Sequence, residues 1–426
     1  MIQIEPARAL VGHIGVPGDK SISHRALLLG AVGEEETVVR GFGRSGDTEA
    51  TLAAVRTLGV EVAEDEVDLV RVAGRGLWGL RAPEGPIDCG NSGTLLRLLP
   101  GLLAGQAGRF ELIGDESLRT RPVRVDEPLA RMGAHVETTE GFAPLVVEGG
   151  ELRGISYELP VASAQLKSAV LLAGLYASGE TTVAEPLPTR DHTELLLAQA
   201  GVRVRRKPGR ATVSGAERLA LGEVEVPGDF SAAAPFIVAA TLLPGSELYV
   251  HDVGLNPTRT GLLDVLARMG ARVTVFNRRK AGGEHVGDLE IRSAELVATA
   301  VEPHEIPRLI DELPLVALAA GCARGETVVR GAAELRLKET DRIETVTTSL
   351  RALGVRISAS ENGFRVRGVP TRPKGGGMAS LGDHRLVMVG AIAGIVSREG
   401  VRLEGPEAVG VSFPGFFDLL ESVTQR

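Results

Sequence analysis

The sequence predicts an α/β fold of two domains, each made of three βαβαββ-type repeats with buried parallel helices inside and sheets outside. Three observations indicate this. The chain has 426 residues, more than one ordinary hydrophobic core holds. Apolar helices rich in small residues start at six places spaced 66 to 82 residues apart, near Asp19, Asn91, Ser163, Asp229, Asp311 and Asp383. Five amphipathic segments between them end at a glycine, at Gly59, Gly133, Gly201, Gly270 and Gly354.

The first helix of each repeat begins at Asp, Asn or Ser, whose short side chains can cap the free N–H groups of a helix. A strand-like stretch usually follows the helix, such as ETVVRG from Glu36 and again from Glu326. These helices are too apolar for a surface, so we expect them inside the sheets. The 54 glycines and the 3% of aromatic residues suit helices that pack closely together.

The second helix of each repeat ends at the glycine, and an alternating strand follows, as in RMGARVTV. The sixth such helix would be FPGFFDLLESV at the C-terminus, with no residues left for its strand. We therefore expect MIQIEPA, at the N-terminus, to fill that place. This predicts a first domain of residues 16–226 and a second of residues 1–15 plus 227–426. The two crossovers lie near Pro17 and Pro227, where the tetrapeptide VPGD occurs twice.

Composition excludes several classes of function. The net charge of −8 leaves no basic field for nucleic acid. Cys89 and Cys322 give neither a disulfide framework nor a metal spacing, which fits a reducing compartment. No signal peptide is evident, and the apolar run from Leu386 is too short to span a bilayer. We expect a cytoplasmic protein without metal, cofactor, nucleic-acid partner or membrane partner.

One motif invites a different interpretation. GFGRSG at Gly41–Gly46 matches the dinucleotide fingerprint G-x-G-x-x-G, with Glu61 further along. The stretch after the second ETVVRG reads GAAELRLKETDR and has no such glycines. Because the repeat recurs without the fingerprint, we expect a structural turn here. Cys89 is expected to be a small buried residue, since no histidine lies near it in sequence.

The starts of the buried helices carry unequal chemistry. A helix N-terminus offers free N–H groups and a positive dipole, so several starts together would suit anions. A lone arginine there is usually a solvated surface charge, and DKS or DHR alone could be a cap with a salt bridge. Lys20 and Lys338 weigh more, because only six of the 47 basic residues are lysine. The fourth start, DFSAAA from Asp229, is expected to lack ligand chemistry.

Seven motifs together resemble those of the 5-enolpyruvylshikimate-3-phosphate synthases, in the same order and along nearly the whole chain. They are PGDKSISHRALLLGA, GNSGTLLR, TRP, SAQLKSAVLLAGL, RDHTE, LKETDRI and GDHRLVM. The resemblance implies the fold described above. It also implies transfer of the enolpyruvyl group of phosphoenolpyruvate to the 5-hydroxyl of shikimate 3-phosphate with release of phosphate, by a monomeric enzyme.

The resemblance also implies roles for single residues. Those expected to bind shikimate 3-phosphate are Lys20, Ser21, Arg25, Ser163, Ala164, Gln165, Arg190, Asp311 and Lys338. Those expected to bind phosphoenolpyruvate are Lys20, Gly93, Arg121, Gln165, Arg342 and Arg385. Arginine forks suit carboxylate and phosphate groups. For catalysis, Glu339 would donate the proton to the methylene carbon and Asp311 would partner the 5-hydroxyl, with Lys20 assisting.

The sequence departs from the family pattern at Val411 and at Ala164, which stands where others have a second serine. Many members have lysine before the S/T-F-P motif, where this chain has Val411. SAQLKS and RDHTE resemble the branch that is less sensitive to glyphosate, whereas Gly93 is typical of sensitive members, so sensitivity to glyphosate stays open.

One alternative function is enolpyruvyl transfer to UDP-N-acetylglucosamine. The enzymes with that function use a cysteine-bearing loop, whereas the corresponding stretch here, GDESLRTRPV, has no cysteine. The other is a non-catalytic phosphosugar-binding protein, which would have little use for Asp311 and Glu339 among cations.

Overall fold

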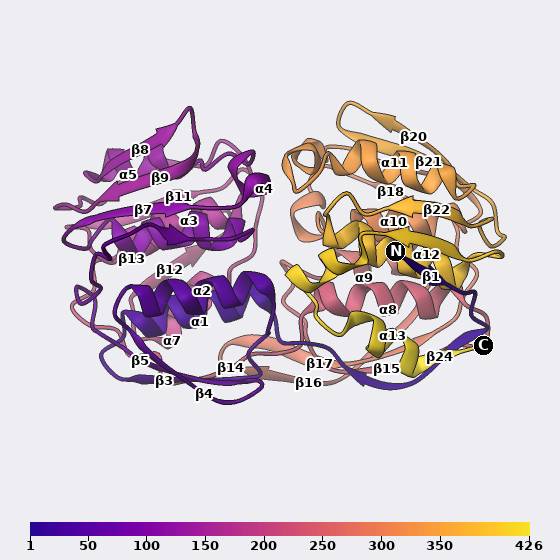
Figure 1. The fold of residues 1–426 in the computed structure, drawn as a ribbon, viewed down its shortest axis with the longest axis horizontal. Coiled ribbons are helices and arrows are strands. Elements are labelled where there is room, and N and C mark those ends of the chain that lie inside the picture. Colours follow the sequence, from indigo (N-terminus) through magenta and orange to yellow (C-terminus); the bar gives the residue numbers. More distant parts are fainter. The chain divides into compact units, whose positions relative to one another are not determined.

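The computed structural model describes residues 1–426 and has the predicted α/β fold (Figure 1). The chain forms two compact units. Unit 1 comprises residues 1–17, 228–279 and 285–426, and unit 2 comprises residues 18–227 and 280–284. The short segment 280–284 differs from the expected domain division. It joins unit 2 because the buried carboxylate of Glu284 is hydrogen-bonded to Nδ1 of His192 at 2.6 Å.

Unit 2 contains three βαβαββ repeats. The first has α1 (Lys20–Ala31), β3 (Glu36–Arg40), α2 (Gly46–Thr57), β4 (Glu61–Glu66) and β5 (Leu69–Ala73). The second has β6 (Ile87–Asp88), α3 (Gly93–Leu103), β7 (Arg109–Ile113), α4 (Glu116–Arg119), α5 (Asp126–Met132), β8 (His135–Thr139) and β9 (Phe142–Glu148). The third has β10 (Ser156–Glu158), α6 (Ala164–Ala173), β11 (Glu180–Ala184), α7 (His192–Gln199), β12 (Val204–Lys207) and β13 (Arg210–Ser214), and β14 (Glu223–Glu225) follows it.

Unit 1 repeats the pattern. Its first repeat has β2 (Ala9–Gly15), α8 (Phe230–Leu242), β15 (Glu247–Gly254), α9 (Gly261–Arg268), β16 (Arg272–Ala281) and β17 (Glu284–Arg292). The second has β18 (Ala300–Val301), η1 (Ile306–Arg308), α10 (Leu313–Gly321), β19 (Gly325–Val329), η2 (Ala333–Leu337), α11 (Arg342–Ala352), β20 (Arg356–Ser360) and β21 (Gly363–Gly368). The third has β22 (Gly376–Ala379), α12 (His384–Val396), β23 (Val401–Glu404), η3 (Pro406–Val411), α13 (Phe416–Val423), β24 (Thr424–Gln425) and β1 (Ile2–Ile4).

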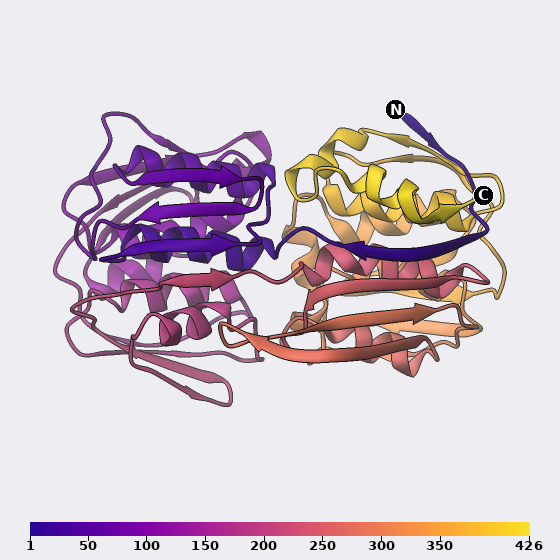
Figure 2. The ribbon, with the colours of Figure 1, turned by 90° about the horizontal axis from the view of Figure 1, so that it is seen from below.

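The two VPGD segments mark an exchange of strands. In the other repeats, the strand before the first helix pairs in parallel with the strand after it, as β6 does with β7. Here β14 pairs in parallel with β3, and β2 pairs in parallel with β15 (Figure 2). The N–H of Asp19 donates to the carbonyl of Pro227, and the N–H of Asp229 donates to that of Pro17, both at 2.8 Å. The turn therefore occurs twice because each copy hydrogen-bonds the other.

The N-terminal strand completes the sixth sheet. β1 pairs antiparallel with β23, with Ile2 opposite Leu403 and Ile4 opposite Val401. The expectation that no strand follows the last helix was wrong, because the two residues of β24 pair with β2 of the neighbouring sheet. The sixth sheet consequently has three strands, in the order β1-β23-β22, where four other sheets have four.

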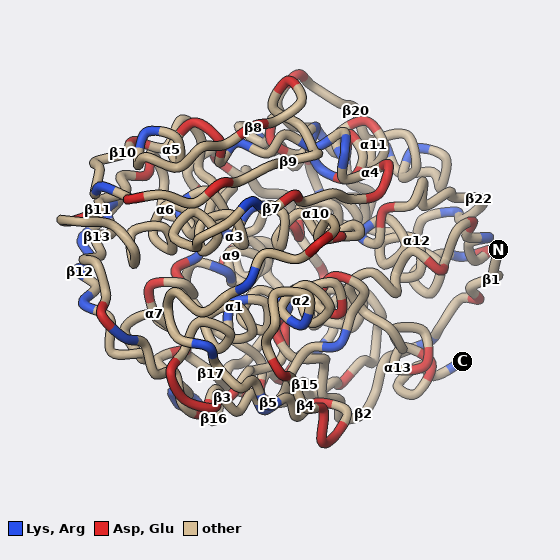
Figure 3. Tube along the Cα trace, turned by 60° about the vertical axis from the view of Figure 1, so that its left-hand side comes forward, with Lys and Arg blue, Asp and Glu red and all other residues tan.

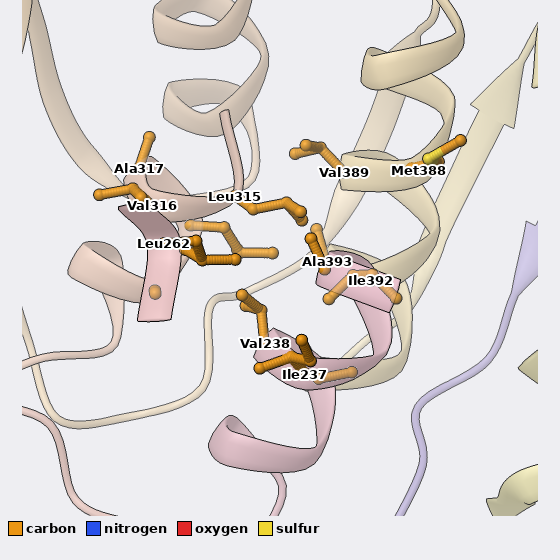
Figure 4. Close-up of a cluster of buried hydrophobic side chains, with 14 of the residues drawn as sticks. Ile237, Val238, Leu262, Leu315, Val316, Ala317, Met388, Val389, Ile392 and Ala393 are labelled. Atoms are coloured by element: carbon orange, nitrogen blue, oxygen red, sulfur yellow. The ribbon is translucent and has the colours of Figure 1, made fainter. Parts of the chain in front are cut away.

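The first helix of each repeat lies buried within the sheets, as predicted. In unit 1, side chains of α8, α9, α10 and α12 meet in one cluster that includes Ile237, Leu262, Leu315 and Ile392 (Figure 4). Every residue of α12 is buried, so this helix has no solvated face. Acidic and basic residues are both scattered along the trace (Figure 3). None of the helices has both the length and the apolar character needed to cross a membrane.

Glycine positions follow the predictions closely. The five glycines expected to end the second helices all have positive φ, between +83° and +115°. The GFGRSG segment is a turn before α2, whose N-cap is Ser45. A Cβ at Gly18 would lie 1.7 Å from the carbonyl oxygen of Gly41, and one at Gly43 would lie 2.1 Å from that of Gly18. These glycines therefore permit two backbone segments to touch, which explains the motif without a dinucleotide.

Candidate active site

Most of the predicted site residues of unit 2 lie in the N-terminal halves of α1, α3 and α6, while Arg121 follows α4 and Arg190 precedes α7. Arg25 of α1 donates from Nε to Thr193 Oγ1 at 2.7 Å and from Nη2 to Ser168 Oγ at 2.8 Å. Gln165 of α6 donates from Nε2 to Thr94 Oγ1 at 3.0 Å. These bonds hold the starts of the three helices side by side, with their free N–H groups at the same end.

The charges around Arg25 indicate an anion-binding environment. Burial, together with the positive charge of Arg190, lowers the pKa of Arg25 to about 10. Burial, together with the charges of Lys20 and Arg25, lowers the pKa of His24 well below its ordinary value. Cations held this close together are stabilised by an anion, and shikimate 3-phosphate carries such charge.

Lys20 begins α1 directly after its N-cap, Asp19, whose side chain accepts from the N–H of Ile22. Its Nζ forms an ion pair of 2.7 Å with Asp47 of α2. The carbonyl of the next residue, Ser21, accepts from Arg25 Nη1 at 2.9 Å. Asp47 was not among the predicted residues, because it lies outside the charged helix starts, yet it fixes the direction of the Lys20 side chain.

Gly93 and Arg121 lie together at the start of α3. Arg121 is buried and donates from Nη2 to the backbone oxygen and the side-chain oxygen of Asn91, at 2.7 and 3.0 Å. The expected capping role of Asn91 was wrong: Ser92 caps α3, because the Asn91 side chain is engaged with Arg121 and donates to Asp115. Arg97, the last residue of GNSGTLLR, was missed as a support.

Arg97 connects this start to the start of α6. It donates from Nη1 to Gln165 Oε1 at 2.7 Å and from Nη2 to the carbonyl of Pro122 at 2.7 Å. Ser163 caps α6 by accepting from the N–H of Leu166, and Ala164 is the first helical residue. Both functional ends of Gln165 thus have protein partners, so its orientation is fixed before any substrate binds.

Lys167 has a structural role that the sequence did not reveal. It is 1% exposed, and its Nζ lies 2.8 Å from Glu194 and 3.3 Å from Glu185. The same Nζ donates to the carbonyl of Thr189 at 3.3 Å. Because Arg190 is the next residue, Lys167 fixes the backbone that carries this predicted ligand.

Two predicted residues of unit 1, Asp311 and Glu339, lie beside Arg342 at the start of α11. Arg342 donates to both carboxylate oxygens of Asp383, at 2.8 and 3.0 Å, and from Nη2 to Glu339 Oε2 at 2.5 Å. Burial alone would lower the pKa of Arg342, but the charges of Asp383 and Glu339 outweigh it and raise the pKa. Arg342 is therefore a permanent cation with a fixed fork, next to a carboxylate predicted to be catalytic.

Asp311 lies among three cations of unit 1. Its Oδ1 is 3.6 Å from Arg342 Nη1 and 3.9 Å from Lys338 Nζ, while Oδ2 accepts from Arg259 Nη1 at 3.1 Å. The prediction that Asp311 caps the next helix was wrong. α10 begins after Glu312 without a side-chain cap, and the Asp311 carboxylate is held by these cations instead. Arg259 was missed, because nothing around it in sequence marks it as a site residue.

The sequence suggested that the fourth helix start lacks polar chemistry, but the structure shows polar side chains there. Asp229 caps α8, and the hydroxyl of Ser231 accepts from Arg259 and donates to Glu312. Arg385 of α12 donates from Nη1 to the Ser231 carbonyl at 3.4 Å. The apolar sequence of this start hid its two polar residues, which meet Arg259 and Glu312 only in the folded chain.

Cys89 and its neighbour Gly90 have structural explanations. Cys89 is fully buried, and burial raises the pKa of its thiol, so it is no nucleophile. Its neighbour Gly90 adopts a left-handed conformation, with φ of +53°.

Comparison with known proteins decides the family. The family model described as EPSP synthase (3-phosphoshikimate 1-carboxyvinyltransferase) matches residues 4–420. The chain belongs to the EPSP synthase family. The 3-phosphoshikimate 1-carboxyvinyltransferase of Alkalilimnicola ehrlichii is 50% identical over 98% of this chain and 94% of its own length. That of Pelobacter propionicus is 49% identical over 99% and 98%.

Solved structures agree with this assignment. An EPSP synthase from Acinetobacter baumannii is 41% identical and superposes with a TM-score of 0.88, covering 99% of this chain and 97% of that one. The enolpyruvyl transferase NikO from Streptomyces tendae has a TM-score of 0.77 over 99% and 96% of the two chains, at 19% identity. The second likeness shows a shared fold.

The residue before the S-F-P motif is Val411, where the resemblance to the family suggested a lysine. Val411 is the last residue of η3, and the S-F-P motif follows it. The ring of Phe413 packs against Phe236 and Phe416, with centroid distances of 6.3 and 5.5 Å. The motif therefore contributes to the core of unit 1, whereas the position before it carries no cation.

Proposed function

We propose that this chain transfers the enolpyruvyl group of phosphoenolpyruvate to the 5-hydroxyl of shikimate 3-phosphate and releases phosphate. The observation that carries the proposal is the arrangement around Arg342 in unit 1. Its two terminal nitrogens lie 2.5 Å from Glu339 and 3.6 Å from Asp311, with Lys338 also beside Asp311. Two carboxyl groups on one fixed cation suit a reaction with two separate proton transfers.

The chemistry assigns a proton transfer to each carboxyl group. The methylene carbon of phosphoenolpyruvate must gain a proton while the 5-oxygen attacks the adjacent carbon, and the 5-hydroxyl must lose one. We assign the donation to Glu339 and the hydroxyl contact to Asp311, with Lys20 assisting. Expulsion of phosphate and loss of a methyl proton then restore the double bond in the product.

Binding of the two anions is assigned to the remaining residues. Those proposed for shikimate 3-phosphate are Lys20, Ser21, Arg25, Ser163, Ala164, Gln165, Arg190, Asp311 and Lys338. Those proposed for phosphoenolpyruvate are Lys20, Gly93, Arg121, Gln165, Arg342 and Arg385. The burial of Arg25, Arg121, Arg342 and Arg385 supports this division of labour, because a buried guanidinium binds carboxylate and phosphate oxygens strongly.

Phosphate release tests the proposal directly. The purified chain is incubated with phosphoenolpyruvate and either shikimate 3-phosphate or UDP-N-acetylglucosamine, and phosphate is measured. We expect phosphate release with shikimate 3-phosphate as the acceptor and none with UDP-N-acetylglucosamine. Turnover with UDP-N-acetylglucosamine would support the alternative transferase, and binding of shikimate 3-phosphate without any phosphate release would support a non-catalytic protein.

Arg25→Ala tests the binding assignment. It should weaken binding of shikimate 3-phosphate far more than it lowers turnover at saturation, since Arg25 is assigned no proton transfer. A lower kcat with unchanged affinity would contradict that role.

We further propose that the chain is a monomer and acts in the cytoplasm. Light scattering would measure its molar mass, and the location of a tagged chain in the cell would test the compartment.

A further inference from the structure

A buried polar network lies behind Asp311 in unit 1. Arg259, just before α9, is 6% exposed. It donates from Nη1 to Asp311 Oδ2 at 3.1 Å and from Nη2 to Ser231 Oγ at 2.5 Å, and Nη2 lies 3.5 Å from Asp229. The Ser231 hydroxyl donates in turn to Oε1 of Glu312. One guanidinium thus connects three acidic residues, of which only Asp311 is assigned to the reaction.

This network is not a typical stabilising feature. Glu312 is 0% exposed, and its Oε2 has no hydrogen-bond partner. Burial raises the pKa of the Glu312 carboxyl. Burying a carboxyl group that is only partly hydrogen-bonded costs free energy, and replacing buried ionic groups by apolar side chains of similar size is often neutral or stabilising. A role of the network in the reaction would explain why the chain keeps a buried carboxyl group at this cost in free energy.

The two oxygens of Asp311 face different groups. Oδ2 is bound by Arg259, whereas Oδ1 faces Arg342 and Lys338. A carboxylate attached through one rotatable bond is fixed in rotation when one oxygen has a short, charge-assisted hydrogen bond. Arg259 therefore determines which oxygen of Asp311 is presented to the cations assigned to the substrates.

We propose that Arg259 is a positioning residue: it binds Oδ2 of Asp311 and so presents Oδ1 to the 5-hydroxyl, while Ser231 and Glu312 hold the guanidinium in place. The proposal rests on the role given to Asp311 under the proposed function. Ser231 at the start of α8 and Glu312 at the start of α10 thus hold the Arg259 guanidinium together.

The charges around Asp311 predict the sign of a pH effect. Arg259, Arg342 and Lys338 are the cations facing it, and the acids nearest to those cations are Asp383, Glu339, Asp229 and Glu312. Removing Arg259 takes a positive charge from 3.1 Å, which makes the ionised carboxylate less favourable. The acid limb of the kcat profile should move to higher pH.

The test compares Arg259→Lys, Arg259→Gln and Ser231→Ala with Asp311→Asn, and uses Arg268→Gln as control. Arg268 is an exposed arginine of α9 that pairs with Glu305 at 2.8 Å. We expect Arg259→Gln to lower kcat roughly tenfold to a hundredfold, as misplacement of a catalytic group does, with KM changed far less. Arg259→Lys should recover part of kcat, and Ser231→Ala should lose less than Arg259→Gln.

A double-mutant cycle separates this inference from the proposed function. Arg259→Gln added to Asp311→Asn should cause no further loss, because both act through one carboxylate. If Asp311→Asn keeps normal turnover, the assignment of Asp311 fails. If Asp311→Asn is inactive while Arg259→Lys and Ser231→Ala retain wild-type kcat and pH profile, the positioning role of Arg259 is overturned. The melting temperature of each variant identifies loss of folding, and the two mild variants then carry the test.

Discussion

Gly93→Ala should separate the binding of phosphoenolpyruvate from that of glyphosate. Gly93 is the first residue of α3, and its φ is not in the left-handed region, so alanine causes no backbone strain. A Cβ there would lie 3.1 Å from Arg97 Nη1 and 3.4 Å from Arg121 Nη1. At 3.1 Å, the neighbouring guanidinium must move by a few tenths of an ångström.

The fixed position of Arg97 sets the magnitude. Because it is bound to Gln165 and to the carbonyl of Pro122, both at 2.7 Å, it resists this movement. Overpacking of a well-packed site costs about 1–3 kcal/mol, which is roughly a tenfold to hundredfold loss of affinity. Glyphosate, an analogue of phosphoenolpyruvate that is about one atom longer, should meet the new methyl group more directly.

Steady-state kinetics measure both effects. We expect glyphosate to compete with phosphoenolpyruvate, and Gly93→Ala to raise the inhibition constant of glyphosate by a larger factor than the KM of phosphoenolpyruvate. Gly85→Ala is the matched control, since Gly85 is exposed and a Cβ there meets nothing within 4 Å. Equal factors for inhibitor and substrate would refute the steric explanation.

Three further changes test the remaining assignments. Lys20→Met and Glu339→Gln should each lower kcat by roughly 10²-fold or more, as loss of a positioned proton-transfer group does, and near-normal turnover of Glu339→Gln would refute its role as donor. Lys167→Met leaves the buried Glu194 and the partly buried Glu185 without their cation and should destabilise the protein by about 3–5 kcal/mol, measured by urea unfolding; an unchanged midpoint would contradict this. Burial raises the pKa of Asp383, but its pairing with Arg342 lowers it overall. This pairing should therefore stabilise the fold above about pH 4 and lose that effect as the pH falls further, and melting curves of Asp383→Asn should show a weaker acid dependence than those of the native chain.

Local patterns predicted most of the fold. The capping roles of Asp19, Ser163, Asp229 and Asp383 were confirmed, because a cap contacts N–H groups only two or three residues away. The glycine ends of the second helices were confirmed for the same reason, since the left-handed turn is a property of the residue itself. Asn91 and Asp311 failed as caps because distant arginines bind their side chains.

The candidate site was predictable where single motifs carry it. Arg25, Gly93, Gln165, Lys338 and Arg342 belong to motifs that can be recognised in the sequence without knowledge of their neighbours. Their supports were not predictable in this way. Arg97 ends such a motif, but its bonds to residues of other segments become visible only in the folded chain.

The sequence by itself determined the repeats, the helix ends, the family and the residues proposed to contact substrate, because each depends on short-range patterns. The tertiary structure decided which charges meet. Ser231 and Glu312 are 81 positions apart and Arg259 and Asp311 are 52 apart, yet they form one hydrogen-bonded network. No periodicity or composition encodes such a meeting. It arises because buried polar groups must find partners once the helices pack, and the packing of α8 beside α10 determines which partners are within reach.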